Sequence, residues 1–501
     1  MPTSRRAFLA ATAVTTAALS TVAGCLGSRE GATAGQTQTS TRPPEGSSNE
    51  TGSRRDGDGA FDGLLARNAT VAYTHLRASG NRVLASGNRV LTSGNRVLAS
   101  GNVADAEPVE LDVSGTPAWL LAYGHSVASG DDGQTTFWTV VTEAGTARTH
   151  RVTPTGSERL VDHGAVSTPP LGYATAEPAS GGVGVVDTPA TVASATHPVP
   201  LERGWLYVDP EGDLVVREVD DGETRFDLSV PRDARIVHLD GPRYVLYGGA
   251  TDRYRHGALG DSVEGSRLAV VDTDSGRLLV DRELDSSVFE GLSPLAADVD
   301  GDGRREVVTT VSDAARGARI RVYDADGTER ATGPVYGSGW RHQLCVASFL
   351  TDGPPEIAVV RKPHVDQTLE FYRLVDGELR VTATLEGYAS HTYGSRNLDG
   401  GLAADLDADG RVELLVPTTD RRQLDGVRRG GAGGQPDEGT GSDGRQGDGA
   451  AVAWSLPLDG RLSTNVGGTV TRDGLAVGAG TPDGVRVWTG RGHSTASRPS
   501  R

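Results

Sequence analysis

Long apolar runs are missing from this 501-residue sequence. A transmembrane helix takes about 20 predominantly apolar residues, so the sequence excludes a polytopic membrane protein. Positive charge is also scarce, because 49 Lys and Arg stand against 66 Asp and Glu, a formal net charge of −17. An acidic surface repels phosphate backbones, and nucleic acid is therefore not an expected partner.

Cysteine is almost absent, with only Cys25 and Cys345 in the chain. Two distant cysteines cannot form the disulfide framework that stabilises many secreted domains, so the core or metal ions must do so. Cys345 lies in an apolar run, which predicts a buried structural thiol rather than a nucleophile. The Gly-x-Ser-x-Gly, His-Glu-x-x-His and phosphate-loop motifs are absent too, and no catalytic residue is assigned.

The basic residues are nearly all arginine, since Lys362 is the only lysine. Together with the acid excess, this composition resembles proteins of haloarchaea, whose surface carboxylates hold hydrated cations in brine. A high-GC genome is the alternative explanation for the arginine, but it leaves the surplus of acids unexplained. The resemblance implies that most of the negative charge serves solvation.

The N-terminus has the features of an export address. Arg5 and Arg6, followed by Phe8 and an Ala/Thr-rich stretch, resemble a twin-arginine signal. Val22–Cys25 resembles a lipobox, although an incidental cysteine after an ordinary signal is the alternative. The resemblance predicts a signal peptide over 1–24, lipidation of Cys25 and a place on the extracellular face of the cytoplasmic membrane. Composition predicts a disordered stalk over 25–60 and a disordered tail over 491–501.

Residues 61–490 have the pattern of an all-β domain. Short Val/Leu/Tyr-rich runs alternate with Gly/Asp/Asn turns, and few segments have helical periodicity. A nearly perfect heptad repeat over 78–102 and a Gly/Asp-rich loop over 425–450 interrupt the rhythm. A strand–turn–strand unit recurs and predicts outer hairpins of four-stranded blades, at 206–212, 270–276, 322–327, 372–377 and 454–460.

Two acidic loops carry the clearest chemistry. In each, carboxylates at positions 1, 3 and 5 can converge on one cation, glycine at position 6 makes the turn, position 7 offers its backbone carbonyl, and a glutamate stands at position 9. This oxygen-only set predicts two structural calcium sites. The alternative is a pair of solvated acidic turns. The predicted ligands are Asp298, Asp300, Asp302, Arg304 and Glu306 in one loop, and Asp405, Asp407, Asp409, Arg411 and Glu413 in the other.

The context of these loops is strand–loop–strand. An EF-hand would need flanking helices and Glu at position 12, where Thr309 and Val416 stand. The loops instead resemble the calcium-binding hairpins of FG-GAP or VCBS repeats, the blades of integrin-α-like β-propellers. A degenerate copy at 348–356 lacks the first two carboxylates and predicts no metal. Repeat spacings of 50 to 57 residues, extended over the body, predict a single β-propeller of about seven four-stranded blades.

In such a blade, the segments before strand one and after strand two lie on the face opposite the loops. Cationic and aromatic residues gather in these segments and predict a ligand face for an anion. Salt bridging to local acids and aromatic packing are the alternative. The candidate residues are Trp340, Arg341, His342, Arg361, Lys362, His364, His391, Tyr393, Arg396, Arg421 and Arg422, with Arg253, Tyr254 and His256 added by analogy of position.

These features predict a monomeric cell-surface lipoprotein that acts as a binding or interaction module. Its partners would be an anionic small molecule, a glycan or a surface protein, and it would contact the membrane through its lipid anchor only. The alternative is an extracellular carbohydrate-active enzyme, similar to propeller polysaccharide lyases, that uses the His/Arg/Tyr face. The repeated Trp motif of quinone-dependent propeller dehydrogenases is absent.

Overall fold

The computed structural model describes residues 72–73, 92–93, 96–97 and 100–492, except 125–132, 175–182, 187, 202–203, 219–221, 255–256 and 431–448. The predicted signal peptide, the predicted lipidation site Cys25, the predicted stalk and residues 493–501 lie outside the described residues. So do most of the heptad repeat and the middle of the Gly/Asp-rich loop.

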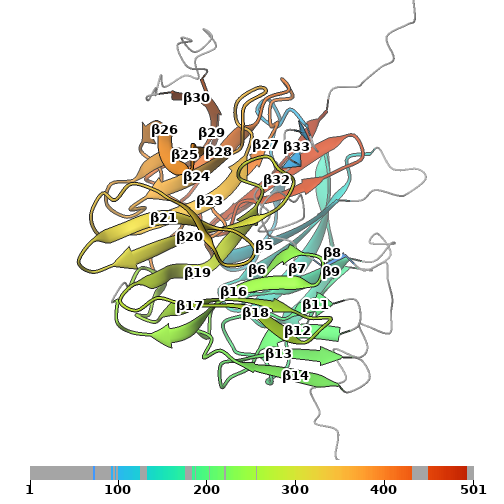
Figure 1. The fold of residues 1–501 in the computed structure, drawn as a ribbon. Coiled ribbons are helices and arrows are strands. Elements are labelled where there is room, and N and C mark those ends of the chain that lie inside the picture. The colour runs from blue at the N-terminus through green and yellow to red at the C-terminus, as the bar shows by residue number, and fades with distance from the viewer. Residues whose placement is uncertain are drawn as a thin grey trace, which may run out of the picture. The chain divides into compact units, whose positions relative to one another are not determined.

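Nearly all regular structure is antiparallel sheet (Figure 1). Four sheets are meanders of four strands that follow one another in the chain. They are formed by β5 (Pro117–Gly124), β6 (Thr136–Thr142), β7 (Thr146–Thr153) and β8 (Gly156–Ala165); by β11 (Val199–Leu201), β12 (Gly204–Val208), β13 (Asp213–Glu218) and β14 (Glu223–Asp227); by β23 (Arg341–Ala347), β24 (Glu356–Arg361), β25 (Thr368–Val375) and β26 (Glu378–Glu386); and by β27 (Leu402–Ala404), β28 (Glu413–Pro417), β29 (Gln423–Arg429) and β30 (Ala450–Pro457).

An eight-stranded sheet consists of two further units of the same kind. A single residue pair, Gly265 with Phe289, joins them. The first unit has β15 (Val237–Asp240), β16 (Arg243–Thr251), β17 (Glu264–Asp272) and β18 (Arg277–Glu283), and the second has β19 (Val288–Ala297), β20 (Glu306–Asp313), β21 (Gly317–Tyr323) and β22 (Glu329–Thr332).

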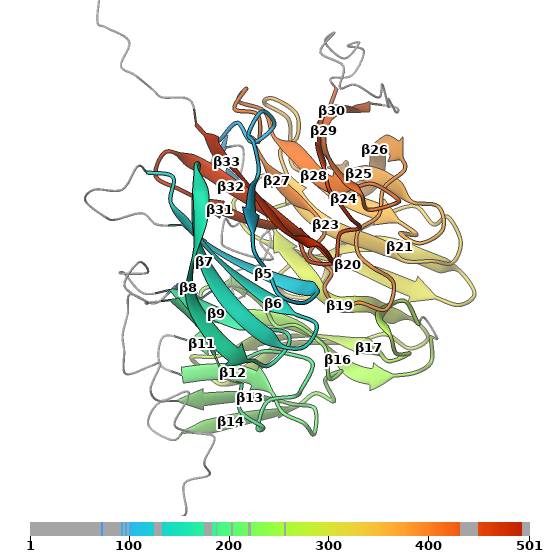
Figure 2. The same cartoon turned by 180° about the vertical axis from the view of Figure 1, so that it is seen from behind.

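The last four-stranded sheet combines the two ends of the described domain. Its strands are β31 (Gly467–Val470), β32 (Gly474–Thr481), β33 (Gly484–Arg491) and β4 (Val109–Leu111). The early strand β4 pairs with β33, which Figure 2 shows in red near the blue beginning of the domain. In this pairing Leu111 lies opposite Val485 and Val109 opposite Val487. A strand from the beginning of the domain therefore completes the sheet at its end.

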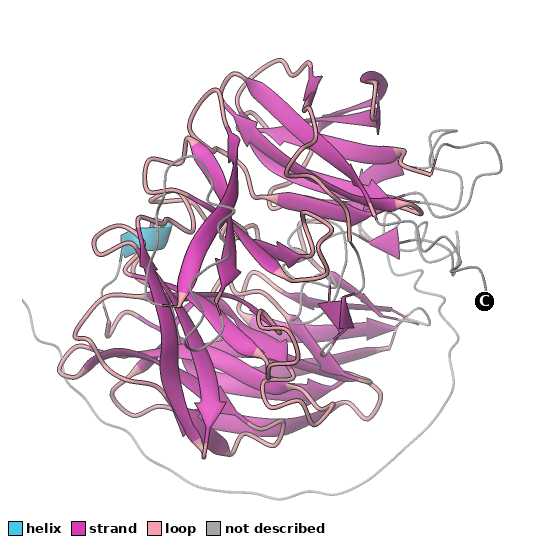
Figure 3. Cartoon of the chain, turned by 90° about the horizontal axis from the view of Figure 1, so that it is seen from above, coloured by secondary structure: helices cyan, strands magenta, loops and turns pink. Residues whose placement is uncertain are grey.

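Smaller elements complete the described structure. A three-stranded sheet contains β1 (Ala72–Tyr73), β9 (Leu171–Ala174) and β10 (Val183–Val186), and β2 (Thr92–Ser93) pairs with β3 (Arg96–Val97) inside the heptad repeat. The one helical element among the described residues is the 3-10 turn η2 (Gly257–Leu259) (Figure 3). Within the described part of the chain, no helix is long and apolar enough to cross a membrane.

Neighbouring sheets pack against one another through apolar side chains. One hydrophobic cluster joins Leu295 and Val308 of the β19–β22 unit to Val346, Ile357 and Val359 of the β23–β26 unit. Similar clusters continue from β23–β26 to β27–β30, and from there to β31–β33. Because sheets packed in this way are covered on both faces, inner strands such as β6, β20 and β24 are buried almost throughout.

Successive four-stranded meanders, packed face to face and completed by a strand from the other end, have the architecture of a β-propeller. The predicted all-β class and propeller fold are confirmed. Of the five predicted outer hairpins, those at 270–276, 322–327 and 372–377 join the third and fourth strands of a unit. The other two predictions were wrong, because 206–212 joins β12 to β13, the second and third strands, and 454–460 leads out of β30.

The loop predicted over 425–450 is too long, because strands occupy both of its ends. Gln423–Arg429 forms β29, in which Asp425 is fully buried, and β30 begins at Ala450. Asp425 accepts hydrogen bonds from Tyr388 and Ser455, so its carboxylate is compensated inside the sheet. A Gly/Asp-rich composition looks like loop, but here the flanking acid belongs to a buried polar network.

Candidate functional site

The two acidic loops lie where their sequence predicted. The first connects β19 to β20 and the second connects β27 to β28, so each joins the first and second strands of its unit. Carboxylate oxygens of Asp298, Asp300 and Asp302 lie within 4.8 Å of one another. In the second loop the same holds for Asp405, Asp407 and Glu413 (two of these three side chains are buried). Each loop therefore offers at least three oxygen ligands to one hard cation.

The backbone of the two loops has matching hydrogen bonds. The N–H of Gly303 donates to Asp298 over 3.0 Å, and the N–H of Gly410 donates to Asp405 over 3.2 Å, so the first carboxylate and the position-6 glycine are joined in both. These glycines have φ of +89° and +90°, a conformation that side chains with a Cβ rarely adopt. Arg304 and Arg411 were predicted to offer their backbone carbonyl oxygens to the metal, and their side chains are exposed.

The glutamate at position 9 of each loop is buried and accepts a hydrogen bond from the backbone of the same loop. Glu306 accepts the N–H of Val299 over 2.9 Å, and Glu413 accepts the N–H of Leu406 over 3.0 Å. Burial raises the pKa of Glu306 to about 7 and that of Glu413 to about 8, and the neighbouring aspartates add to both shifts. A cation in either loop would favour the charged form of its glutamate.

An arginine also reaches into each acidic loop. Arg330 pairs with Asp300, and with Asp324 over 3.1 Å. In the second loop Arg428 pairs with Asp407 and lies 3.1 Å from Glu413. A guanidinium can therefore compensate the carboxylates that the sequence assigns to calcium.

The arginine comes from the fourth strand in the first unit (Arg330, β22) and from the third strand in the second (Arg428, β29). The strand register explains this difference. Leu414 pairs with Val427, so the next residues, Glu413 and Arg428, lie opposite each other on adjacent strands. In the first loop the corresponding register places an acid, Asp324, opposite Glu306. The first loop is therefore richer in negative charge than the second.

The degenerate loop between β23 and β24 keeps its position-9 acid, Glu356, which is fully buried. Its carboxylate accepts hydrogen bonds from Arg373 over 2.8 Å, from Thr382 over 2.6 Å and from Arg429 over 2.9 Å. Arg429 belongs to β29 of the next unit, so this ion pair ties two neighbouring units together. Two guanidiniums compensate the acid here.

Five predicted ligand-face residues form one ring cluster, which we call the histidine cluster: Trp340, His342, His364, His391 and Tyr393. The ring of Trp340 stacks on His342 with centroids 4.4 Å apart and meets His391 edge-on at 5.2 Å. His364 lies 4.6 Å from His391 and 5.2 Å from Tyr393. Three segments bring these rings together: Trp340 and His342 stand at the start of β23, His364 follows β24, and His391 and Tyr393 precede β27.

Exposure divides the cluster into a base and a rim. Trp340, His342 and His391 are buried, His364 is half-buried, and Tyr393 is 65% exposed. A ligand can therefore touch Tyr393 and His364, while the three buried rings hold them in place. The sequence placed these five residues on one face, and only the structure separates exposed rings from buried ones.

Three predicted cations of the face are compensated by acids. Lys362 lies 3.1 Å from Asp366, and Arg361 lies 2.9 Å from the same carboxylate. Arg396 pairs with Asp233 over 2.8 Å and with Asp261 over 2.5 Å. Salt bridging, the stated alternative for this face, therefore holds for these three groups, with Asp366 close in the sequence and Asp233 and Asp261 far away.

Other predicted face residues have different places. Arg341 is fully buried with its guanidinium 5.2 Å from the ring of Tyr336, so it cannot meet a ligand directly. Arg253 donates to the carbonyls of Leu284 and Asp285. The carbonyls of Arg421 and Arg422 accept hydrogen bonds from the connection after β30. His256 lies outside the described residues.

Tyr254 lies near two buried acids, Glu264 and Glu290, that were not predicted from the sequence. Burial, with Glu290 and Glu264 close by, raises the pKa of Tyr254 to about 12. Glu290 accepts a hydrogen bond from Ser312, and Glu264 accepts the N–H of Gly291 over 2.9 Å. Burial and the nearby Glu290 also raise the pKa of Glu264. Glu290 stands inside the otherwise apolar run Val288–Leu292, and this position in the sequence could have predicted a buried acid.

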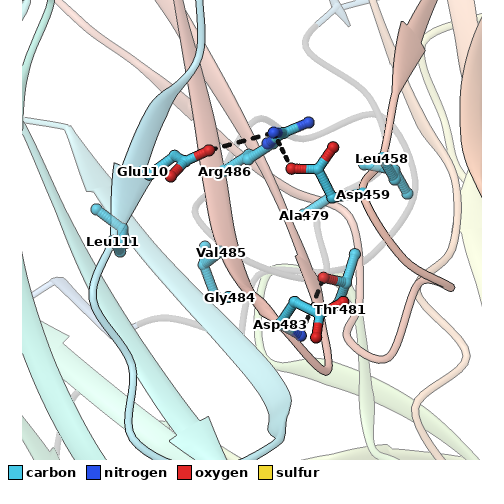
Figure 4. Close-up of a pocket in the computed structure, with 10 residues that line it drawn as sticks. All are labelled: Glu110, Leu111, Leu458, Asp459, Ala479, Thr481, Asp483, Gly484, Val485 and Arg486. Carbon is cyan, nitrogen blue, oxygen red and sulfur yellow. Dashed lines mark hydrogen bonds and ion pairs between the residues drawn. The ribbon is translucent and has the colours of Figure 1, made fainter.

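A surface pocket that contains no residue of the histidine cluster lies beside β4 and β33 (Figure 4). Figure 4 shows Arg486 between Glu110 and Asp459, and both carboxylates pair with it. Asp483 lies on the same wall. The one arginine of the lining is thus already compensated, and the remaining acidic charge disfavours an anionic ligand.

Comparisons with known proteins concern the fold. No family model matches the chain, and no curated protein is similar to it. Among solved structures, the chain is similar to the C-terminal WD40 domain of Sif2, with 8% identity, coverage of 77% of this chain and 99% of that one, and a TM-score of 0.44. It is also similar to BamB from Moraxella catarrhalis, with 9% identity, coverage of 80% and 98%, and a TM-score of 0.33. Values this low carry no argument about function.

Proposed function

We propose that this β-propeller is a binding module whose ligand contacts the rim of the histidine cluster. The observation that carries the proposal is the meeting of His391 and Tyr393, from the segment before β27, with His364, from the segment after β24, beside the buried Trp340. An exposed tyrosine ring beside imidazoles offers both a stacking surface and hydrogen-bond donors, which suits a sugar ring carrying a carboxylate. The ligand class is therefore an anionic glycan.

The same proposal includes two structural calcium ions, one in each acidic loop. The support is the shared placement of the loops between first and second strands, their matching hydrogen bonds, and the oxygen-only ligand set. These features agree with the resemblance to FG-GAP or VCBS repeats. Calcium would fix connections on the side of the units opposite the histidine cluster.

The proposed cellular location rests on the sequence alone. The twin-arginine pattern, the lipobox at Cys25 and the acid-rich, lysine-poor composition support a haloarchaeal lipoprotein held at the outer face of the cytoplasmic membrane. A lipid-anchored monomer would bind soluble glycan or a surface protein. Mass spectrometry of the membrane fraction for a lipid-modified Cys25 tests this assignment.

Binding of the full chain to an array of anionic glycans tests the ligand proposal. For a glycan that binds, we expect Tyr393→Ala and His364→Ala each to weaken affinity about tenfold, because exposed aromatic contacts often dominate such interfaces. Arg486→Ala is the matched control, since it alters the other pocket. Loss of binding in Arg486→Ala with full binding in Tyr393→Ala would move the site to that pocket.

An extracellular lyase is the second candidate, favoured by the contact of Tyr393 with His364. A phenol and an imidazole can act as base and acid on a uronate. Any glycan that binds should therefore be incubated with the protein and checked for new reducing ends. A pure binding module leaves the glycan intact, whereas a lyase produces unsaturated ends that disappear in Tyr393→Phe.

Arg428 provides a test of calcium at the second loop. Arg428→Gln is expected to raise calcium affinity at this loop about tenfold, because it removes a positive charge next to the proposed cation. Isothermal titration of metal-free protein measures the change. The control is Arg411→Gln, whose exposed guanidinium lies 4.0 Å from Asp409, and it should change affinity by much less. A weaker site in Arg428→Gln would show that the arginine organises the loop instead.

A further inference from the structure

Two imidazoles of the histidine cluster are placed as a metal-binding pair. The Nε2 atoms of His364 and His391 are 3.1 Å apart, while their ring centroids are 4.6 Å apart and the rings are 77° from parallel. A head-on N–H···N hydrogen bond would separate the centroids by the nitrogen distance plus a ring radius at each end, which is more than is found. The two nitrogens therefore approach side by side, as two ligands of one ion do.

The other nitrogen of His391 has a partner of its own. Its Nδ1 lies 3.0 Å from the hydroxyl oxygen of Ser390, which is fully buried. When the ring donates from Nδ1 to this oxygen, Nε2 keeps its lone pair for a cation. Metal-binding histidines usually have such a hydrogen bond on the nitrogen that does not face the metal.

Access comes from the rim of the cluster. His391 is buried, but His364 is half-buried and its ring meets that of Tyr393, which is 65% exposed. A cation between the two Nε2 atoms would thus have protein on one side and open positions toward solvent. Water or an anionic group of a ligand can occupy these positions.

We propose that His364 and His391 bind one divalent transition-metal cation of the Cu²⁺ or Zn²⁺ class. Imidazole nitrogens suit these ions and not calcium, which takes oxygen ligands, so the site is chemically distinct from the acidic loops. The inference goes beyond the glycan-binding role and needs no glycan for its test. Loss of metal binding would leave the array result standing, and the converse also holds.

Copper(II) alone is the probe, added to the untagged full chain after removal of other metals. Trp340 lies 5.2 Å from His391, so bound Cu²⁺ is expected to quench its fluorescence, and Trp340→Phe should remove that signal. Paramagnetic resonance should show two imidazole nitrogens on the copper. His364→Gln and His391→Gln are each expected to weaken binding at least tenfold, whereas His238→Gln, a half-buried histidine bonded to the Gly241 carbonyl, should not.

The outcomes are decisive in both directions. Copper affinity that survives in both histidine variants, or a spectrum without two imidazole nitrogens, overturns the site. If His391→Gln fails to fold because its ring is buried, His364→Gln still decides, since that position is half-buried at the rim. Competition by Zn²⁺ for the same copper signal would extend the site to zinc.

Discussion

Glu356→Ala is expected to lower the free energy of unfolding by about 3–5 kcal/mol, because it leaves the buried guanidinium of Arg429 and the half-buried one of Arg373 without their carboxylate. Glu356 is fully buried and Arg429 is 3% exposed, so salt and water screen this pair poorly. Chemical denaturation followed by tryptophan fluorescence measures the loss. The effect should persist at high salt, unlike that of a surface ion pair.

Glu378→Ala is the matched control, because its pair with Arg380 is exposed on both sides. Such a pair contributes about 0–1 kcal/mol, so the control should unfold almost like the native chain. Replacing Glu356, Arg373 and Arg429 together by methionine should recover most of the lost stability, since no buried charge is then left alone. Equal losses in Glu356→Ala and Glu378→Ala would contradict the interpretation of a buried tether.

Removal of calcium is expected to produce the other large effect. A ligand at a hundredfold excess over its Kd stabilises the folded state by about 2.7 kcal/mol per site, so chelation should lower the melting temperature by several degrees. Scanning calorimetry at low salt, with calcium and with EDTA, measures this. The variant Asp298→Asn with Asp300→Asn should lose one site, and Asp405→Asn with Asp407→Asn should lose the other.

The pH dependence gives calcium an independent signature. In the metal-free protein the raised pKa values of Glu306 and Glu413 favour their protonated forms, so stability falls as the pH rises from about 4.5 toward 8. Calcium binding at pH 7 should release protons and remove that fall. Asp272→Asn with Asp274→Asn, in the ordinary turn between β17 and β18, is the control. An EDTA scan identical to the calcium scan would remove the metal from the proposal.

The repeat rhythm of the sequence was sufficient to predict the fold and the placement of the loops. Strand patterns and turn residues are local, and the positions of Asp298 and Asp405 between first and second strands follow from them directly. Segments before and after these strands also predicted that Trp340, His364 and His391 would meet. Each of these predictions depends on the spacing of strands and turns along the chain, and this spacing can be read from a single sequence.

Charge compensation could not be predicted in the same way. Arg396 pairs with Asp233 and Asp261, which are 163 and 135 residues away in the chain, and no local pattern indicates such partners. The burial of Arg341 depends on Tyr336 folding over it, a contact decided by packing. The pairing of Arg428 with the second loop required the register of two strands, which turn residues alone do not give.

The pairing of β4 with β33 has a consequence for the order of synthesis. Glu110 and Arg486, which face each other across this pairing, are 376 residues apart in the chain. At about 5–20 residues per second, a ribosome needs roughly 20–75 s to make the residues between them. Throughout that time β4 has no partner strand, and the nascent chain must keep this edge from pairing with other chains. The domain can complete its fold only when nearly the whole polypeptide has left the ribosome.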